Sequence, residues 1–388
     1  MFKKRISIPV MVISCIICFA LGVTGFYYFS SIGSMSGKLR EFERVVMNNF
    51  DGEIDAAEVD EAVFSAYLKA LDDKYATYVP ASEAEEFKDG FKGEGAGIGV
   101  TMIKNDAGNM EIVTVHKDSP ADKAGLKTGD EITGADDKTI DGIGYEELYK
   151  YIRSKQKGDN INLTVLRDGA EQKITVTYGE YTTQTVFYHK INQLGYIKFT
   201  HFDAATVEQF ETALDDLMQQ DVKGLIFDVR GNGGGTVDSV CKILDKLLPE
   251  CDLISAKYKD GKEVVLHRSD KNEIDLPMSV LTDGGTASAS ELFAAAIREK
   301  RDGVLYGEKT YGKGVMQTTF NLSDGSCVKI TVAKFYSPDK NNWDGTGLSP
   351  DKEIKLTEEQ QKNYYKLTDE TDPVIKAAAD DMTAKIAG

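Results

Sequence analysis

The sequence predicts a multidomain chain of mixed α/β and α+β class, and three observations support this prediction. The 388 residues exceed the usual size of a single domain. Short strands separated by glycine-rich turns fill the middle of the chain, and alternating strands and helices fill its second half. We expect a short basic stub followed by an apolar, membrane-spanning helix within 1–37, a helical segment at 38–91, a β-rich domain at 92–180, and a βα-layered domain with a helical tail at 181–388.

The composition narrows the possible function classes. Hydrophobic residues make up 41% and charged residues 28% of the chain, which is typical of a globular protein and excludes global disorder. With 46 basic and 63 acidic residues, the net charge of −17 disfavours binding to a phosphate backbone, so we expect no nucleic-acid partner. Only Cys241, Cys251 and Cys327 follow the apolar amino terminus, so at most one internal disulfide can form, and we expect no metal site.

The amino terminus predicts a transmembrane helix. Residues 8–29 form a mainly apolar run of 22 residues, and no charged residue occurs between Arg5 and Lys38. About 20 such residues suffice to cross a bilayer as a helix. The basic residues 3–5 favour a cytoplasmic amino terminus, which predicts a single-pass protein of the cell membrane whose remaining chain is extracytoplasmic. A cleaved signal peptide and lipidation at Cys15 are the alternatives.

Two stretches mark the helical segment and the start of the β-rich domain. Apolar residues recur at helical spacing between Glu58 and Leu71. Glycines then cluster from Gly93 to Gly99, and strands are expected at 100–103 and 111–115. The glycine spacing does not match G-x-G-x-x-G, which excludes a dinucleotide-binding fingerprint.

Two motifs of the β-rich domain resemble a bacterial-type PDZ domain. The first is Gly97-Ile98-Gly99-Val100. The second contains a short helix that Ser119 caps, Pro120 opens and Gly125 ends. The resemblance covers about residues 92–180 and implies that a peptide adds to a sheet edge while N–H groups of the glycine-rich loop hold its terminal carboxylate.

Three residues of the helix expected at 145–153 are further candidates for peptide binding. Leu148 and Ile152 lie four positions apart on one helical face and could line the peptide groove, although core packing explains them equally well. Arg153 is an electrostatic candidate for the same peptide.

In the second half of the chain, the segment Asp283–Glu291 is the most suggestive of catalysis. It lies between an apolar strand and a helix, where a hydroxyl and exposed N–H groups can meet a reacting carbonyl. None of the four histidines forms a catalytic or zinc-binding pattern. Ser288-Ala-Ser-Glu291 also matches a capping box, and this segment alone favours a helix cap at Ser288 over a nucleophile.

Two other segments, Asp228–Gly235 and Thr310–Gln317, change that interpretation. Together with Asp283–Glu291 they resemble the carboxyl-terminal processing proteases, also called tail-specific proteases. The resemblance implies a nucleophile, a general base and an amide that orients the base: Ser288, Lys313 and Gln317. It also implies an oxyanion hole made of two backbone N–H groups, those of Gly234 and Ala289.

This catalytic set makes two demands on the structure. Lys313 must be buried and neutral to accept the proton of Ser288, so its pKa must fall from ~10.4 toward ~7 to 8. Gln317 lies four residues further on, about 13 Å along a regular strand, so a bend near Gly314 is needed if its side chain is to orient the amine. Taken alone, Lys313 is typical of a surface lysine, and the loop containing Gly234 of a plain strand-to-helix turn.

The resemblance extends beyond the three catalytic segments. Leu71–Tyr78 resembles an early element of the family and Gly345–Asp351 a late one, so that it covers about residues 40–352. Three residues depart from the family pattern without removing a catalytic group: Thr286, Gly233 and Trp343.

The sequence therefore predicts a membrane-anchored, extracytoplasmic serine endopeptidase of the carboxyl-terminal processing type. Its expected partners are protein substrates with accessible carboxyl termini, recruited by the PDZ-like domain, and the lipid bilayer, through residues 8–29. No cofactor is expected, and the sequence leaves a homodimer open. The main alternative is a catalytically silent PDZ scaffold, and a third is a Ser-Lys hydrolase of non-peptide acyl groups.

Overall fold

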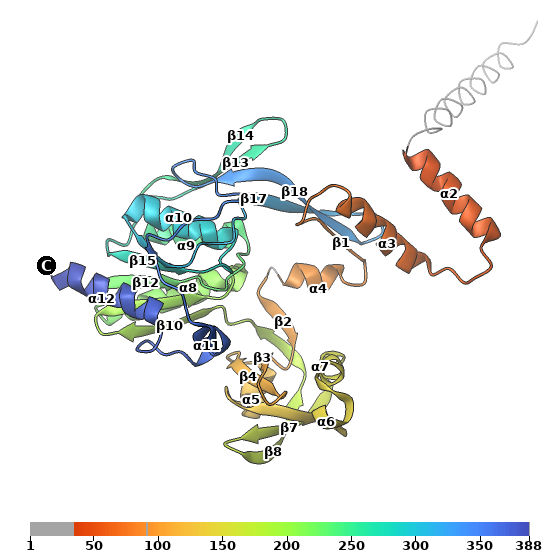
Figure 1. The fold of residues 1–388 in the computed structure, drawn as a ribbon, viewed down its shortest axis with the longest axis horizontal. Helices are drawn as coiled ribbons and strands as arrows, with labels where there is room; N and C mark the ends of the chain where they lie inside the picture. The colour runs from red at the N-terminus through yellow and green to blue at the C-terminus, as the bar shows by residue number, and fades with distance from the viewer. Residues whose placement is uncertain (1–34, 91, 388) are drawn as a thin grey trace, which may run out of the picture. The chain divides into compact units, whose positions relative to one another are not determined.

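The computed structural model describes residues 35–90 and 92–387 (Figure 1). It divides into two compact units, one ending at Val63 and the other beginning at Phe64, and each is described by itself. The predicted membrane segment at 8–29 lies outside the described residues. Within the two described ranges, no helix combines the length and the apolar composition needed to cross a bilayer.

The first described residues form two helices. α2 spans Met35–Asn49 and α3 spans Ala56–Lys69. The Asp55 carboxylate accepts hydrogen bonds from the N–H groups of Ala57 at 2.9 Å and Glu58 at 3.2 Å, which satisfies donors at the start of α3. The predicted helix is therefore present, and its limits are shifted by two residues.

The β-rich domain is built on a sheet of order β3-β4-β5-β7-β8, with β6 beside β5. The Ser119 side chain caps α5 by accepting a hydrogen bond from Asp122 N–H at 3.2 Å, and Gly125 ends the helix in the left-handed conformation, as predicted. The bounds of the elements are β3 Val100–Lys104, β4 Met110–Val115, α5 Pro120–Ala124, β5 Glu131–Ala135, β6 Lys138–Thr139, α6 Ile140–Ile143, α7 Tyr145–Arg153, β7 Asn160–Arg167 and β8 Ala170–Thr177.

A two-stranded ribbon joins this domain to the rest of the chain. β2 (Glu94–Gly97) pairs antiparallel with β9 (Gly179–Thr182), so the chain enters and leaves the domain side by side. α4 (Ala84–Asp89) precedes the ribbon.

The βα-layered domain is built on a six-stranded sheet of order β10-β11-β12-β15-β16-β19. β10 is antiparallel to β11, and the strands from β11 to β19 are parallel to their neighbours. The bounds are β10 Val186–Ile191, β11 Leu194–Phe199, α8 Ala204–Gln219, β12 Gly224–Asp228, α9 Val237–Leu247, β15 Met278–Thr282, α10 Ala289–Arg301, β16 Val304–Gly307, β19 Lys352–Glu353, α11 Glu358–Lys362, a 3-10 turn at Tyr364–Lys366 and α12 Pro373–Ala387.

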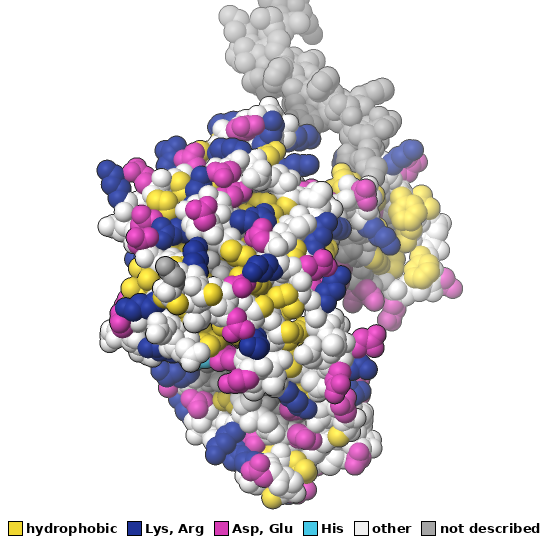
Figure 2. All heavy atoms as spheres, turned by 60° about the vertical axis from the view of Figure 1, so that its left-hand side comes forward, with side chains coloured by type: hydrophobic (Ala, Val, Ile, Leu, Met, Phe, Trp, Pro, Cys, Tyr) yellow, Lys and Arg dark blue, Asp and Glu magenta, His cyan; other side chains and the backbone are white. Residues whose placement is uncertain are grey.

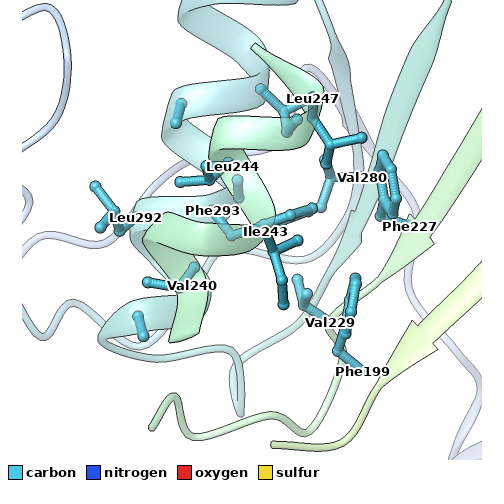
Figure 3. Close-up of a cluster of buried hydrophobic side chains, with 14 of the residues drawn as sticks. Phe199, Phe227, Val229, Val240, Ile243, Leu244, Leu247, Val280, Leu292 and Phe293 are labelled. Atoms are coloured by element: carbon cyan, nitrogen blue, oxygen red, sulfur yellow. The ribbon is translucent and has the colours of Figure 1, made fainter. Parts of the chain in front are cut away.

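Helices cover both faces of this sheet. α8, α9 and α10 pack on one face around a cluster of phenylalanines that includes Phe199, Phe227 and Phe293 (Figure 3). α12 packs on the other face, against side chains that alternate with those of the first cluster along the strands, such as Ile226 and Leu281. Burying each such side chain contributes about 1.5–3 kcal/mol relative to leaving it exposed. The sheet is therefore a rigid support for the loops at its strand ends.

Five further strands form a second sheet. Its order is β1-β18-β13-β14, with β17 also paired to β18. The hairpin of β13 and β14 was not predicted from the sequence. The bounds are β1 Thr77–Val79, β13 Asp252–Tyr258, β14 Glu263–Arg268, β17 Val315–Asn321 and β18 Cys327–Tyr336.

Charges of both signs are mixed over the surface. On the face that Figure 2 shows, Lys and Arg side chains are interspersed with Asp and Glu side chains. Many of them form exposed ion pairs, such as Lys242 with Asp238 at 2.7 Å and Lys376 with Asp380 at 2.8 Å. Exposed pairs of this kind contribute only about 0–1 kcal/mol each, so the buried sheet and helix contacts determine the fold.

Candidate active site

The candidate site lies at the carboxyl ends of two neighbouring parallel strands. β12 and β15 are paired with Asp228 opposite Leu281, and glycine-rich loops follow both strands. The first loop leads into α9 and the second into α10. Loops at this edge of a parallel sheet commonly hold ligands and reacting groups, because the strands fix where each loop starts. Ser288 is the last residue of the second loop.

Ser288 has a strained backbone. It occupies the N-cap position of α10 with φ 58° and ψ −116°, whereas a helix cap normally has extended dihedral angles. A residue with a side chain in this region costs about 1–3 kcal/mol, and such strain persists only where the surroundings impose it. The side chain of Ser288 is partly exposed. The turn therefore has the geometry of a nucleophile elbow rather than that of an ordinary cap.

The carboxylate of Glu291 connects Ser288 to the segment that contains Lys313. Its Oε2 atom accepts hydrogen bonds from the N–H groups of Ser288 at 2.9 Å and Lys313 at 2.8 Å. Its Oε1 atom accepts from Gly312 N–H at 2.8 Å and from the Thr310 hydroxyl at 2.6 Å. Glu291 is fully buried, and all four donors converge on it. The sequence identified Glu291 only as part of a capping box, because contacts across 20 residues leave no local signal.

Lys313 is half-buried and has a lowered pKa. Burial lowers the pKa of its amine below the ordinary value and the nearby charge of Lys329 lowers it further, while Asp73 and Glu291 act in the opposite direction. The Nζ atom lies 4.4 Å from the centroid of the Tyr75 ring. In the described part of the chain, no hydrogen bond joins the Lys313 amine to the Ser288 hydroxyl.

Gln317 is held by a neighbouring strand. Its Nε2 atom donates to the hydroxyl of Thr331 at 3.2 Å and to the carbonyl of Val315 at 3.4 Å. The register of β17 against β18 shifts between Met316 and Gln317, so the segment is irregular two residues later than the bend expected at Gly314. Among the described residues no hydrogen bond links Gln317 to Lys313, so its orienting role stays a prediction.

The two predicted oxyanion donors lie beside Ser288. A Cβ atom added to Gly234 would be 2.9 Å from the Ser288 Cβ and 3.0 Å from the Ala289 N atom, so only glycine fits there, at φ 109°. In the residues that the structure describes, Ala289 N–H has no acceptor. Gly234 N–H, in contrast, donates to the Asn232 side chain at 2.9 Å. An oxyanion would therefore have to compete with Asn232 for this donor.

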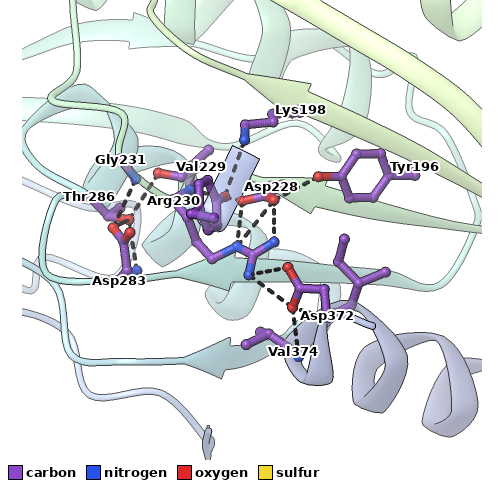
Figure 4. Close-up of polar contacts among 12 residues, drawn as sticks. Tyr196, Lys198, Asp228, Val229, Arg230, Gly231, Asp283, Thr286, Asp372 and Val374 are labelled. Atoms are coloured by element: carbon purple, nitrogen blue, oxygen red, sulfur yellow. Dashed lines mark hydrogen bonds and ion pairs between the residues drawn. The ribbon is translucent and has the colours of Figure 1, made fainter. Parts of the chain in front are cut away.

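A buried network of ion pairs and hydrogen bonds holds the start of the loop that follows β12 (Figure 4). Arg230 pairs with Asp228 at 2.6 Å and with Asp372 at 2.9 Å, and the Tyr196 hydroxyl donates to Asp228 at 2.7 Å. Burial would raise the pKa of Asp228, but the Arg230 guanidinium holds it below its ordinary value. Removing one partner of such a buried pair costs about 3–5 kcal/mol, so this network is a structural support that sequence reasoning missed.

Asp283 forms hydrogen bonds with both glycine-rich loops. Its Oδ1 atom accepts hydrogen bonds from Gly231 N–H and Gly285 N–H, each at 2.9 Å. The hydroxyl of Thr286 donates to the carbonyl of Val229 at 2.9 Å, so the residue that departs from the family's serine still bridges the loops.

The glycine-rich loop of the β-rich domain has free donors. Gly97 and Gly99 have φ of 153° and 81°. Within the described ranges, the N–H groups of Ile98 and Gly99 have no acceptor. They are suited to a carboxylate, since consecutive N–H groups form an anion-binding nest.

The prediction that Leu148 and Ile152 line the peptide groove needs correction. Their side chains are 0% and 2% exposed and belong to the core of the β-rich domain, because α7 turns this face toward the sheet. The alternative of core packing is therefore the one that the structure supports. Arg153 is exposed at the end of α7, 6.0 Å from the Tyr149 ring centroid.

A PDZ-like domain joined to a serine-headed turn on a parallel sheet defines a class, the PDZ-containing serine peptidases. Profiles of known families agree: that of peptidase family S41 matches residues 193–354, and that of the PDZ domain matches residues 96–178.

Proteins similar in sequence identify the family of this chain. The chain is 31% identical over 320 residues to the probable CtpA-like serine protease of Staphylococcus haemolyticus, which covers 82% of this chain and 64% of that protein. It is 30% identical over 351 residues to the carboxy-terminal processing protease CtpA of Bacillus subtilis, covering 90% of this chain and 74% of the relative. The chain belongs to the CtpA-like carboxyl-terminal processing proteases of family S41.

A solved structure also matches. The photosystem II D1 C-terminal processing protease is similar with a TM-score of 0.50 and 26% identity, over 84% of this chain and 88% of that one. The chain spans less than two thirds, 64%, of the length of the staphylococcal relative. The family and the PDZ domain are thus confirmed, whereas the endopeptidase activity of this chain and the roles of individual site residues stay predictions.

Proposed function

We propose that this protein is an extracytoplasmic serine endopeptidase that cleaves protein substrates recognised by their carboxyl termini. The observation that carries the proposal is the Glu291 carboxylate, which binds the strained turn of Ser288 and the N–H group of Lys313 at once. A carboxylate that four donors surround leaves little freedom to either segment. One buried carboxylate therefore holds the backbones of the two segments that contain the proposed nucleophile and base.

The reaction would proceed through an acyl-enzyme. The neutral amine of Lys313 takes the proton of the Ser288 hydroxyl as the oxygen attacks the scissile carbonyl carbon. The C–N bond then breaks, and the ammonium returns the proton to the leaving amine. Water hydrolyses the resulting ester by the same proton transfers. The lowered pKa of Lys313 supports this role, since more of the amine is neutral near physiological pH.

The negative oxygen of the intermediate would be held by backbone donors. Ala289 N–H has no acceptor among the described residues and lies at the start of α10, where the helix dipole adds favourable potential. Gly234 N–H is the second donor after it leaves Asn232. The Lys313 side chain must also rotate toward Ser288, because catalytic contacts are often longer in a free enzyme than in its substrate complex.

Substrate selection would occur at the PDZ domain. The free N–H groups of Ile98 and Gly99 are proposed to bind a terminal carboxylate. A carboxamide lacks that charge, and hydrogen bonds to a charged acceptor are roughly twice as strong as those to a neutral one.

The test of this function compares two unfolded substrates that differ only in a free or amidated carboxyl terminus. We expect the free acid to be cleaved at least about tenfold faster, mainly through kcat/KM, because capture is remote from Ser288. Replacing Ile98 by Glu should erase the difference. Equal cleavage of acid and amide by the intact protein would contradict carboxyl-terminal recognition. No cleavage of either substrate would favour the alternative of a silent PDZ scaffold.

Residues 8–29 are proposed to anchor the protein in the membrane, with the remaining chain on the extracytoplasmic side. The proposal depends on the apolar run and the basic residues 3–5 before it. Full-length protein should sediment with membranes and resist carbonate extraction. A mature chain beginning after residue 25 would instead indicate a cleaved signal peptide. Formation of a homodimer stays a prediction.

A further inference from the structure

The segment Asp73–Tyr75 lies next to the proposed base, although the sequence assigned it no function. It belongs to Leu71–Tyr78, which was noted only for its resemblance to an early element of the family. Pairing of β1 with β18 places Thr77 opposite Lys329. The residues just before β1 therefore reach the part of β18 that faces Lys313 and Gln317.

Asp73 fixes the position of this segment. Its two carboxylate oxygens accept hydrogen bonds from the N–H group and the hydroxyl of Thr331, at 2.9 and 3.0 Å. Tyr75 N–H donates to the same carboxylate at 3.1 Å, which closes a local turn. Burial would raise the pKa of Asp73, but these hydrogen bonds hold it below its ordinary value, so the residue stays a carboxylate above neutral pH.

In the described part of the chain, the Tyr75 ring contacts the Lys313 amine directly, whereas the carboxylates of Asp73 and Glu291 act on its charge from further away. The Nζ atom lies 4.4 Å from the ring centroid, and no carboxylate lies within 4.0 Å of it among the described residues. A cation over an aromatic face is attracted by the ring quadrupole. The Tyr75 hydroxyl is buried and has no hydrogen bond of ordinary geometry among those residues. Lys74 also acts on this side chain, with its Nζ atom 4.9 Å from the same ring centroid, but the Lys313 amine meets the ring face.

We propose that Tyr75 is a positioning residue that holds the protonated amine of Lys313 between turnovers and thereby sets the pH at which the base becomes available. This inference depends on the proposed Ser288 and Lys313 mechanism. The charged groups that face Lys313 from the surrounding elements are Asp73, Lys74, Glu291 and Lys329, and none of them is replaced in the test below.

The sign of the effect separates this role from a structural one. The ring stabilises the ammonium, so removing it should favour the neutral amine and lower the pKa of Lys313. The acidic limb of the kcat/KM profile should then move to lower pH in Tyr75→Leu, by about half to one pH unit for a cation–π contact of this kind. On the linear part of that limb, the variant would be about 3- to 10-fold faster than the unaltered protein. Structural damage alone would only slow the enzyme.

Two controls keep the test decisive. Tyr75→Phe retains the ring face and should leave the limb unchanged, since the hydroxyl has no hydrogen bond of ordinary geometry in the described structure. If Tyr75→Leu does not fold, phenylalanines with increasing fluorination at position 75 keep the shape while weakening the quadrupole, and the limb should move stepwise to lower pH.

The possible outcomes separate a failure of the Ser288 and Lys313 mechanism from a failure of the role proposed for Tyr75. Full activity of the Ser288→Ala variant would refute the proposed mechanism itself. Activity that requires Ser288, combined with superimposable profiles of Tyr75→Leu and the unaltered protein or a stationary limb across the fluorinated series, would refute only the role of Tyr75. A limb that moves to lower pH in the leucine variant but not in the phenylalanine variant would support it.

Discussion

Two serines of this protein, Ser119 and Ser288, each begin a helix, but their backbones differ. Ser119 has φ −71° and ψ 167°, and its side chain accepts a hydrogen bond from Asp122 N–H. Ser288 has φ 58° and ψ −116°. Ser119 is fully buried, whereas Ser288 is partly exposed.

The difference identifies what converts a helix start into a reactive turn. Both positions have the sequence pattern of a cap, so residue type does not separate them. At Ser288 the strain is imposed by tertiary contacts: Gly234 packs directly against the residue, and Glu291 holds its N–H group. Ser119 is packed as closely, since a Cβ added to Gly99 would lie 2.3 Å from its Cβ and its N–H donates to the His116 carbonyl at 3.2 Å, yet it keeps the relaxed geometry of a cap. Close packing alone therefore does not produce the strain, and Ser288 differs in that its cap partner Glu291 also accepts from Gly312 and Lys313.

The largest effect should come from removing the Ser288 hydroxyl. Ser288→Ala should lower kcat by at least about a thousandfold, because no nucleophile is left, while peptide binding by the PDZ domain stays unchanged. Ser119→Ala serves as the matched control. Cleavage assays with titrated enzyme measure both, and full turnover by Ser288→Ala would reject the assignment.

The base should be equally essential and should impose a pH dependence. Because only the neutral amine accepts a proton, kcat/KM should rise with pH, with its midpoint at the lowered pKa of Lys313 and therefore below 10.5, and then level off. Arginine stays protonated throughout, so Lys313→Arg should be inactive. A pH profile of peptide hydrolysis checks both points, and an active Arg variant would exclude Lys313 as the base.

A smaller loss should follow from displacing the reactive turn. In Gly234→Ala the added methyl meets the Ala287 carbonyl O at 2.9 Å and the Ser288 Cβ at 2.9 Å, at a φ that alanine disfavours. We expect kcat/KM to fall about 100-fold, the effect of shifting a reacting group by about 1 Å. Gly233→Ala, where an added Cβ meets nothing within 4 Å, should be close to unaltered protein in the same assay. Similar losses in both variants would argue against this packing as the source of the geometry.

Glu291→Gln should affect both stability and activity. The amide presents a donor where two N–H or O–H groups require an acceptor, at a cost of about 1–3 kcal/mol for each buried group left unsatisfied. We expect a lower free energy of unfolding in denaturant titrations and a kcat reduced about 10- to 100-fold. Glu299→Gln is the control on the same helix, since Glu299 accepts from Ser337, Asn341 and Asp339 away from Ser288. It should lose stability and keep its kcat.

The smallest effect is expected at the ordinary cap. Ser119→Ala removes one capping hydrogen bond and should lower the free energy of unfolding by about 1 kcal/mol. Hydrolysis of a short peptide that does not engage the PDZ domain should stay within about twofold. A loss of kcat as large as that of Ser288→Ala would erase the distinction between the two serines.

Local patterns predicted most elements of this fold. The helix Tyr145–Arg153 has the predicted limits, and the strands expected at 100–103 and 111–115 are each one residue longer, because apolar periodicity and turn residues mark them. The β13–β14 hairpin was missed. Asp260-Gly261 between its strands is a hairpin turn signal that the sequence reasoning overlooked, and β14 is only partly buried, so its apolar residues give a weak pattern.

The candidate site was predictable only in its residue types. Ser288, Lys313 and Gln317 came from a family resemblance, and spacing alone favoured a cap and a surface lysine. The contacts that define the geometry join distant segments: Glu291 to Lys313, Asp73 to Thr331, and Lys313 to Tyr75. No periodicity encodes such contacts. Leu148 and Ile152 show the converse error, since helical spacing alone does not tell a groove from a core.

The central claim is that Ser288 is the nucleophile and that Lys313 activates it. The most direct measurement is labelling of the full chain with a serine-directed acylating probe, followed by peptide mapping of the adduct. We predict a single acylated residue, Ser288, with a labelling rate that rises with pH and is lost in Lys313→Arg. An adduct on another serine such as Ser290, or equal labelling of the Lys313→Arg protein, would contradict the account.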